Sequence, residues 1–373
     1  MLWNHLYLRR LDLRPLPIIL ALMGCSLLVL TSTSGSDVFF SPIVKKQLQW
    51  FAIGWGAYFF CAGLDYHTLR KWAPVLYIIA LVLLLGLFFT NPIQNVRRWY
   101  RIPLIGAELQ PSEIAKLAVV IAMSAFIERK GNGMRQWVPL FQASLLVLIP
   151  FVLILKQPDL GSALVLMPIT LVMFYFAGIK RRVIAVMSIG AMCGLVFINM
   201  MFLGFISHEN FRPIATKVIK EYQYERLNPD TYHQRASQTA ISVGGIKGSG
   251  WKQSEFTGNA FLPAAQTDSV FAAFAEEFGL WGVFIVLTAF FGLIYFSFQV
   301  TALAKDPFGR LLSAGIAVYL AMHVVVNIGM MCGFLPITGV PLILMTYGGS
   351  SVLATMSALG LLQSVYCRRF MFC

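Results

Sequence analysis

Asp268 is the residue of this sequence best placed to act as a general base. It closes a long loop between apolar runs and directly precedes the run Ser269-Val270-Phe271-Ala272-Ala273-Phe274-Ala275. A carboxylate at the border of such a run can reach both water and lipid, and it can accept a proton from a hydroxyl group. The alternative is that Thr267 or Asp268 caps the N-terminus of the following helix, which these residue types do for about 1 kcal/mol. The pattern alone favours the cap.

Two further carboxylates, Glu276 and Glu277, follow within the same apolar run. A continuous helix would place them roughly 12 Å from Asp268 along its axis, since each residue adds about 1.5 Å. Charges inside a membrane span are costly, and they normally face a cavity or a partner. We therefore expect a functional role for this pair, with structural ion pairing as the alternative.

Glu113 and Lys116 lie three residues apart in the segment Gln110-Pro111-Ser112-Glu113-Ile114-Ala115-Lys116, so they share one helical face. They could pair with each other and do nothing more. Because Lys116 also lies within an apolar span, it would equally suit the phosphate of a lipid head group. The residues leave structural pairing and substrate contact evenly balanced.

The stretch Arg97-Arg98-Trp99-Tyr100-Arg101 is typical of an anion site. Guanidinium groups match pairs of phosphate oxygens, and Trp and Tyr favour the membrane interface. Anchoring to anionic head groups explains the stretch almost as well. A last carboxylate, Asp159, lies in the turn Lys156-Gln157-Pro158-Asp159-Leu160-Gly161-Ser162 and could cap the next span.

Membrane-spanning helices must position these residues. The chain has 373 residues, of which 58% are hydrophobic and 12% charged, against about 25% charged in a soluble domain. Apolar runs near the ~20 residues needed to cross a bilayer recur along its whole length. We predict an all-α integral membrane protein, a single membrane domain over residues 1–373. Its ten spans are expected at about 15–33, 48–64, 73–90, 112–127, 137–155, 160–179, 183–205, 270–300, 308–330 and 342–365.

Ten spans put both termini on one side of the membrane. Segments on that side are rich in basic residues, as in Lys180-Arg181-Arg182, so the positive-inside rule predicts that it is cytoplasmic. The same rule accounts for the net charge of +13 without nucleic acid as a partner. The first span is expected to be retained, because no small-residue cleavage pattern follows it. The short loops of the opposite side hold six basic residues, some of which we expect to meet an anion: Lys45, Lys46, Arg97, Arg98, Arg101 and Lys156.

One connection, residues 206–269, is long and falls on the outer side. It contains the Gly-rich stretch Gly244-Gly245-Ile246-Lys247-Gly248-Ser249-Gly250-Trp251, and loops of that length are usually functional. Segment 214–227 has the spacing of a helix in the membrane interface, with an ordinary packed loop helix as the equal alternative.

Neither a metal site nor a cofactor site can be predicted from the motifs. The five histidines and six cysteines show no metal-ligand spacing. There is also no phosphate-binding Gly-rich loop of the Walker type and no nucleophile elbow. No cofactor is therefore expected, and a divalent cation is left open.

Five stretches, in this order along the chain, resemble the shape, elongation, division and sporulation (SEDS) family of membrane proteins. They are RRWYRIPLIGAELQPSEIAKLA, KQPDLGSAL, SQTAISVGGIKGSGW, FLPAAQTDSVFAAFAEEFGLWG and NIGMMCGFLPITGVPLILMTYGGSS. The resemblance covers essentially the whole chain. Within the family, the KQPDLG and NIGM stretches are more similar to RodA, the elongation branch, than to FtsW, the division branch.

The resemblance implies a ten-span peptidoglycan glycosyltransferase in the bacterial inner membrane. Such an enzyme polymerises lipid II at the outer face and works with a class B penicillin-binding protein, a transpeptidase. The family's TD motif makes Asp268 the catalytic residue, so the resemblance favours catalysis over capping. It also implies that Glu113, Lys116 and Asp159 line the central cavity.

Three positions depart from the family pattern. Glu108 stands where the family usually has an arginine, two residues before the glutamine of QPSE, so an expected anion contact is missing. We hypothesise that Arg98 or Arg101 replaces it. Gln266 stands where a histidine often precedes the TD pair, and His233 follows Tyr232 where members often read Tyr-Gln.

The resulting hypothesis is an inverting transfer with Asp268 as general base, while Lys116 and the arginines of residues 97–101 stabilise the departing pyrophosphate. Two other functions are open on the same residues. Charges between helices also serve a transporter or flippase of the same lipid. A non-catalytic scaffold of a cell-wall synthase complex is the third.

Overall fold

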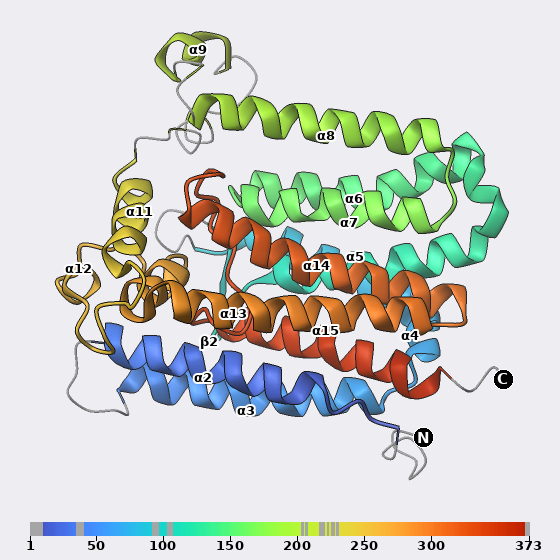
Figure 1. Ribbon diagram of the computed structural model, residues 1–373. Coiled ribbons are helices and arrows are strands. Elements are labelled where there is room, and N and C mark those ends of the chain that lie inside the picture. Colours follow the sequence, from blue (N-terminus) through green and yellow to red (C-terminus); the bar gives the residue numbers. More distant parts are fainter. Residues whose placement is uncertain are drawn as a thin grey trace.

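The computed structural model describes residues 10–34, 41–91, 97–102, 107–202, 205, 208–215, 221, 224, 228 and 231–369. Within these residues, ten helices of 17 to 34 residues lie side by side in one bundle (Figure 1). They are α2 (Pro15–Thr33), α3 (Pro42–Gly63), α4 (Tyr66–Gly86), α5 (Pro111–Lys130), α6 (Trp137–Lys156), α7 (Leu160–Phe176), α8 (Arg181–Phe202), α13 (Val270–Leu303), α14 (Pro307–Met331) and α15 (Gly349–Arg368).

Each predicted span overlaps one of these helices, which confirms the all-α membrane fold. In the described part of the chain, seven helices are long and apolar enough to cross a membrane: α2, α4 with the short 3-10 helix Leu87–Phe89, α6, α8, α13, α14 and α15. Helix α7 is shorter, and α5 includes the charged residues Glu113 and Lys116. Polar side chains inside the bundle therefore weaken the hydropathy signal of a real helix.

Three predicted helix starts were wrong by six or seven residues. Helix α4 begins at Tyr66 rather than near residue 73. Helix α3 begins at Pro42 rather than near residue 48. The prediction started too late because the first turns carry Lys45 and Lys46, which look like a loop in a hydropathy profile. Helix α15 begins at Gly349 rather than near residue 342, because the preceding apolar residues form turns, with Leu344 at a φ of +61°. Apolar composition alone does not distinguish a buried turn from a helix.

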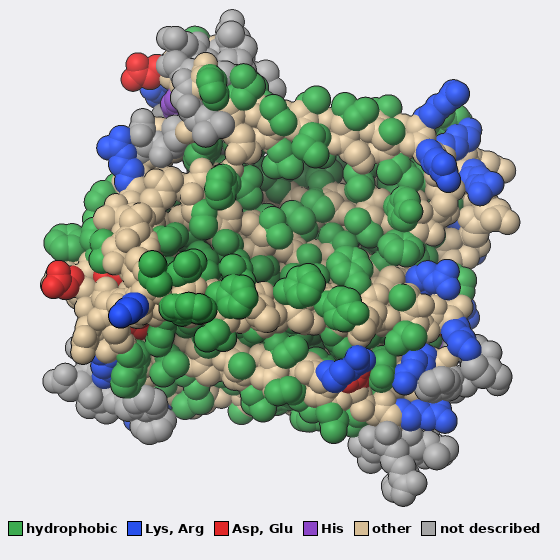
Figure 2. Space-filling view, in the orientation of Figure 1, with side chains coloured by type: hydrophobic (Ala, Val, Ile, Leu, Met, Phe, Trp, Pro, Cys, Tyr) green, Lys and Arg blue, Asp and Glu red, His purple; other side chains and the backbone are tan. Residues whose placement is uncertain are grey.

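The bundle has two chemically different ends. The short helices α9 (His208–Ala215), α11 (Tyr232–Gly244) and α12 (Glu255–Gly258) lie at one end, which we call the loop end (Figure 1). Helix α2 begins and α15 ends at the opposite end, which we call the terminal end. Figure 2 shows a broad apolar band between them, with Lys and Arg side chains gathered at the terminal end. This distribution is typical of a protein that spans a bilayer.

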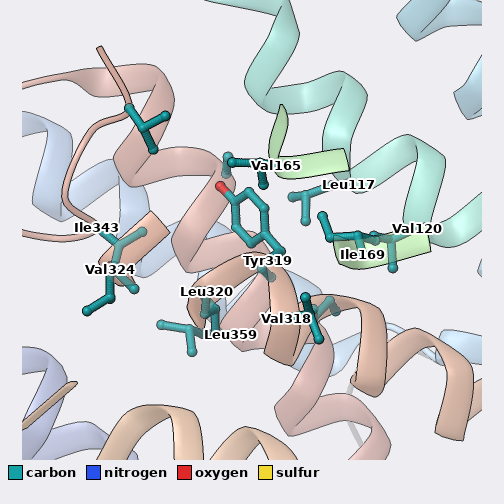
Figure 3. Packing of buried hydrophobic residues seen from close by; sticks show 14 of the residues in the cluster. Leu117, Val120, Val165, Ile169, Val318, Tyr319, Leu320, Val324, Ile343 and Leu359 are labelled. Carbon is teal, nitrogen blue, oxygen red and sulfur yellow. The ribbon is translucent and has the colours of Figure 1, made fainter. Parts of the chain in front are cut away.

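Helices α5, α7 and α14 meet at the centre of the bundle. Leu117 and Val120 of α5, Val165 and Ile169 of α7, and Tyr319 of α14 are all buried there (Figure 3). Lipid tails are as apolar as these side chains, so close packing rather than escape from water holds such helices together. Helix α8, by contrast, lies at the edge of the bundle (Figure 1). None of the residues in its most apolar stretch is buried inside the protein.

Helix α13 is interrupted at Gly279, whose φ of 58° and ψ of −162° are not helical. The Gly-rich stretch that follows α11 packs against this break. The amides of Ser249 and Gly250 donate to the carbonyls of Glu276 (2.9 Å) and Glu277 (3.0 Å), and the amide of Leu280 donates to the carbonyl of Gly245 (2.9 Å). The loop thus satisfies backbone groups that the broken helix leaves unpaired.

This break corrects the prediction of one continuous span over residues 270–300, although the helix is unbroken through Glu276 and Glu277. A Cβ on Gly279 would lie 2.3 Å from the amide nitrogen of Gly248, and a Cβ on Gly248 would lie 2.2 Å from the carbonyl oxygen of Glu277. Both positions also have a positive φ. Glycine is therefore required twice for the loop and the helix to approach each other.

A short hairpin completes the described structure near the loop end. Strand β1 (Tyr100–Ile102) pairs with β2 (Ala107–Leu109) in antiparallel register, with Arg101 opposite Glu108. The predicted interface helix over 214–227 falls largely outside the described residues, so it stays a prediction.

Candidate active site

Asp268 lines a cavity of about 470 Å³ near the loop end of the bundle. Its wall is assembled from segments far apart in the sequence: Lys46 and Trp50 of α3, Arg98 and Trp99 before β1, and residues of the turns between α14 and α15. We call this space the Asp268 cavity. It joins a carboxylate, cationic groups and aromatic faces in one place.

The backbone around Asp268 is fixed by helix α14 and by the turns between α14 and α15. The side-chain Nδ2 of Asn327 donates to the backbone carbonyls of Asp268 (3.1 Å) and Val340 (2.8 Å). The hydroxyl of Thr346 donates to the carbonyl of Thr267 (3.3 Å). Asn327 itself is fully buried. A carboxylate whose backbone is held in this way keeps its orientation towards the cavity.

The structure argues against the capping alternative. The N-cap of α13 is Ser269, and its side chain makes no capping hydrogen bond. The hydroxyl of Thr267 instead interacts with the carbonyl of Ala264. Neither Thr267 nor Asp268 is the N-cap residue, because the chain turns once more before the helix begins. Asp268 is only partly buried, so its carboxylate can meet a substrate.

His233 of α11 lies close to this turn. Its Nε2 is 2.6 Å from the hydroxyl of Ser269. Burial lowers the pKa of His233 below its usual value, while the charge of Asp268 opposes that shift. Gln266, the other departure beside the TD pair, donates to the carbonyl of Thr33 at 3.2 Å. Both departures therefore have a place in the packing around Asp268.

The structure separates the two arginines proposed as anion contacts. Arg98 lines the Asp268 cavity and is only 9% exposed. Its Nε donates to the carbonyl of Gln157 (3.3 Å), and its buried Nη2 has no acceptor among the described residues. Arg101 is 70% exposed and pairs with Glu108 at 3.4 Å. Geometry thus favours Arg98 as the replacement for the missing arginine.

Glu113 and Lys116 form a buried network that sequence spacing only partly predicts. Lys116 Nζ donates to Glu113 Oε1 (2.7 Å) and lies 2.8 Å from His323 Nε2. The hydroxyl of Tyr319 donates to Glu113 Oε2 (3.1 Å). All four side chains are 0% exposed, and we call them the Glu113 cluster. Neither Glu113 nor Lys116 is among the residues that line the Asp268 cavity.

Asp159 connects the turn before α7 to the start of α5. It is the N-cap of α7, where Oδ1 accepts from the amide of Ser162 (3.3 Å). Oδ2 accepts from the side chains of Gln110 (3.0 Å) and Ser112 (3.2 Å). Because Gln110 lines the Asp268 cavity, Asp159 touches that cavity's wall indirectly. The capping role predicted from the turn is present.

The carboxylates of Glu276 and Glu277 form hydrogen bonds with other parts of the protein. Glu276 accepts hydrogen bonds from the amides of Phe256 (2.8 Å) and Thr257 (3.0 Å) and from the Thr257 hydroxyl. Ser32 of α2 donates to Glu277. The carboxylates hold the loop and α2 against the first part of α13. Hydrogen bonding to backbone and hydroxyl groups, rather than the ion pairing considered above, is the structural role found here.

Several functional candidates were not predicted as site residues. Lys46, which lines the Asp268 cavity, was predicted only as one of six basic residues in the outer loops. The signal that could have identified it is the adjacent pair Lys45-Lys46 on the side of the membrane where basic residues are not expected. Asn327 and His323 gave no local signal, since their partners lie 59 and 207 residues away. Across the described residues, no group of three or more His, Cys, Asp or Glu could hold a metal ion.

Comparisons with known proteins give one result throughout. The chain is 32% identical over 377 residues to the peptidoglycan glycosyltransferase MrdB of Escherichia coli K12, with 99% of this chain and 96% of MrdB covered. It is 32% identical over 331 residues to the probable peptidoglycan glycosyltransferase FtsW of Trichlorobacter lovleyi, with 86% and 83% covered.

Solved structures agree. The Thermus thermophilus rod shape determining protein RodA superposes with a TM-score of 0.69 at 26% identity, over 96% of this chain and 98% of RodA. A chain from a peptidoglycan synthase complex that coordinates polymerization and crosslinking reaches 0.76 at 27% identity, with 96% and 98% covered. The family model FtsW/RodA/SpoVE, described as cell cycle protein, matches residues 13–369. The chain therefore belongs to this family, the one that its motifs resemble.

Proposed function

We propose that this protein is a peptidoglycan glycosyltransferase that polymerises lipid II. The observation that carries the proposal is the position of Asp268, a backbone-anchored carboxylate in a cavity that also contains Arg98 and Lys46. Relatives over nearly the full length are named peptidoglycan glycosyltransferases. The cavity has the two components that such a transfer requires, a base and cations for a pyrophosphate.

In the proposed reaction Asp268 acts as general base. It takes the proton from the C4 hydroxyl of the acceptor sugar, and that oxygen attacks the anomeric carbon of the donor. The new C–O bond forms as the bond between the anomeric carbon and the pyrophosphate oxygen breaks, with inversion. The polyprenyl pyrophosphate leaves with the electron pair, and the proton stays on Asp268 until water removes it.

The departing pyrophosphate needs positive charge at fixed positions. Arg98 meets this need best, because its buried Nη2 lacks an acceptor among the described residues and such a donor costs about 1–3 kcal/mol until it finds one. Lys46 is exposed at the same cavity and can follow the phosphates. Glu113, Lys116 and Asp159 are proposed to support the site through the helices that they join.

Orientation and partner belong to the same proposal. The excess of Lys and Arg at the terminal end supports a cytoplasmic position for both termini. In that orientation the Asp268 cavity, at the opposite end, would lie at the outer face of the bacterial inner membrane. A structural neighbour comes from a peptidoglycan synthase complex that couples polymerization to crosslinking. We therefore propose a class B penicillin-binding protein as the partner.

The test uses purified protein and labelled lipid II, with and without a class B penicillin-binding protein. Wild type is compared with Asp268→Asn, which keeps the shape of the side chain. A matched control is Glu255→Gln, an exposed carboxylate at the same end. Parallel reactions contain a divalent cation or a chelator, and glycan strands are separated on a gel.

Polymer from wild type and from Glu255→Gln, but none from a folded Asp268→Asn, is the expected result. Polymer from both Asp268 forms would reject the assignment of the base. If no variant polymerises with the partner present, lipid II movement across liposomes is measured next. Movement without consumption would identify a flippase, and the absence of both activities would identify a scaffold.

A further inference from the structure

A second cavity lies at the terminal end, where α4 begins and α5 ends. It has a volume of about 590 Å³, within the roughly 300–1,000 Å³ of sites for small molecules. Helices α4, α5 and α6 form its walls with mostly apolar side chains, including Tyr77, Ile78 and Phe126. Arg70, Glu128 and Arg129 are its charged residues. We call it the α4–α5 groove.

The groove runs lengthwise along the helices. Arg70 lies in the second turn of α4, and Ile78 lies eight residues further on, a rise of about 12 Å. Arg129 is next to the last residue of α5, and Ala122 precedes it by seven residues, a rise of about 10 Å. The charged rim and the apolar interior are therefore stacked along the membrane normal, in the same order as the head group and acyl chain of a phospholipid.

The chemistry of the interior excludes water as a stable occupant. An ordered water needs about two to four polar partners. The hydroxyl of Tyr77 already donates to the carbonyl of Leu146 (2.9 Å), and the neighbouring wall residues are apolar. Ile78 is 58% exposed on the outside of α4, so the groove adjoins the surface that faces lipid. An acyl chain is the occupant that such a wall accepts.

The rim selects for negative charge. Arg70 is half-exposed and pairs with Glu128 at 3.0 Å, which leaves Arg129 as the excess charge among the three lining residues. Lys71 and Lys130 are exposed beside them, and Lys130 Nζ lies 5.6 Å from the centre of the Phe126 ring. A zwitterionic head group would bring its own cation to this rim, whereas an anionic head group would not.

We propose that the α4–α5 groove is a binding site for an anionic phospholipid of the leaflet at the terminal end. One acyl chain lies between Ile78 and Ala122, and the phosphate contacts Arg129 and the free donors of Arg70. Basic pockets between membrane helices bind anionic lipids through the same charges. The site is independent of the Asp268 cavity and goes beyond the proposed polymerisation.

Native mass spectrometry of the purified full chain tests this, with phosphatidylglycerol or phosphatidylethanolamine added at equal concentration. Wild type is expected to retain phosphatidylglycerol in preference. Arg129→Gln should lower that retention about fivefold, since one basic residue near the membrane surface contributes about 1 kcal/mol. Glu128→Gln should raise it. The matched control Arg181→Gln removes an exposed charge at the same end, at the start of α8, and should change nothing.

A second variant probes the apolar part. Ala125→Leu narrows the groove and should lower the retention of both lipids without regard to head group. Equal retention of the two lipids by wild type, or unchanged phosphatidylglycerol retention in Arg129→Gln, would overturn the proposal. Displacement of phosphatidylglycerol by an equal concentration of a polyprenyl phosphate would assign the groove to the substrate instead. Polymerisation is measured separately, so failure of either proposal is distinguishable.

Discussion

The Glu113 cluster and the Asp268 cavity use charged residues in opposite ways. In the cluster, Glu113, Lys116, Tyr319 and His323 are fully buried and hydrogen-bonded to one another. In the cavity, Asp268 is partly exposed, and no acceptor among the described residues reaches Nη2 of Arg98. A charge satisfied by the protein stabilises the fold, whereas a partly exposed carboxylate and a guanidinium nitrogen without an acceptor among the described residues are available for a substrate.

The largest expected effect is that of Asp268→Asn. Loss of a general base typically lowers a rate by about 10²–10⁴-fold, and we expect a loss in this range without a change in stability. Initial rates of glycan formation and thermal unfolding in detergent measure the two quantities. If Asp268→Asn polymerises at the wild-type rate, Asp268 is not the base, and the contrast between a structural Glu113 cluster and a reactive Asp268 cavity no longer holds.

The next effect concerns stability. Lys116→Met leaves Glu113 as an uncompensated buried carboxylate, and breaking a buried pair in this way costs about 3–5 kcal/mol. The double variant Lys116→Met with Glu113→Gln should recover much of the unfolding temperature, because it removes both charges. If the double variant is stable but inactive, Lys116 takes part in substrate binding after all.

The two arginines sharpen the comparison within one short stretch. Arg98→Gln removes a charge-assisted contact with the proposed pyrophosphate, which is worth about 1.5–3 kcal/mol and corresponds to a loss of about ten- to a hundredfold in kcat/KM. Arg101→Gln only breaks an exposed pair with Glu108, so the expected change is less than about threefold. Full activity in both variants would refute the replacement hypothesis.

Asn327→Ala tests whether the position of Asp268 matters. The substitution removes the donor shared by the carbonyls of Asp268 and Val340 and should lower kcat about tenfold with little change in KM. Asn327→Asp controls for side-chain size without supplying the amide donor. If the unfolding temperature of Asn327→Ala falls together with kcat, the loss of activity would point to a general packing defect instead.

The smallest effect is the pH dependence contributed by His233. Because burial lowers its pKa, the unfolded chain binds more protons below about pH 6.5, and stability falls as pH decreases through that range. His233→Gln should flatten the fall in unfolding temperature between pH 6.5 and the lowered pKa, with little change at pH 8. An identical pH profile in both proteins would contradict this.

Local sequence patterns predicted much of the fold. Apolar runs located every long helix of the bundle, and the polar turn residue Asp159 was correctly recognised as a cap. The break at Gly279 was missed because Phe278 and Leu280 flank it directly and the run is apolar overall, so hydropathy alone does not mark the residue where the helix is interrupted. The hydrogen bonds that stabilise the break come from the distant Gly-rich loop.

The candidate site was predictable only where a motif named it. Asp268 stood out through its position beside an apolar run and through the family resemblance. His323 and Asn327 did not, because each acts on a partner that the chain brings close only after folding. Glu276 misled for the same reason, since its hydrogen-bond partners, Phe256 and Thr257, belong to the short helix α12, 20 and 19 residues earlier in the chain. Contacts between residues far apart in the chain are the part of such a site that cannot be predicted from local patterns in a single sequence.

The close backbone contact between Gly248 of the Gly-rich loop and Gly279 of α13 limits which substitutions this chain can accept over evolutionary time. The contact is made by backbone atoms, so almost any side chain at Lys247 or Ser249 is compatible with it, whereas a methyl group at either glycine is not. A saturation library selected for folded protein should therefore show intolerance at Gly248 and Gly279, and also at Gly244, where a Cβ would lie 2.1 Å from the carbonyl oxygen of Ala275, while Lys247 and Ser249 are permissive.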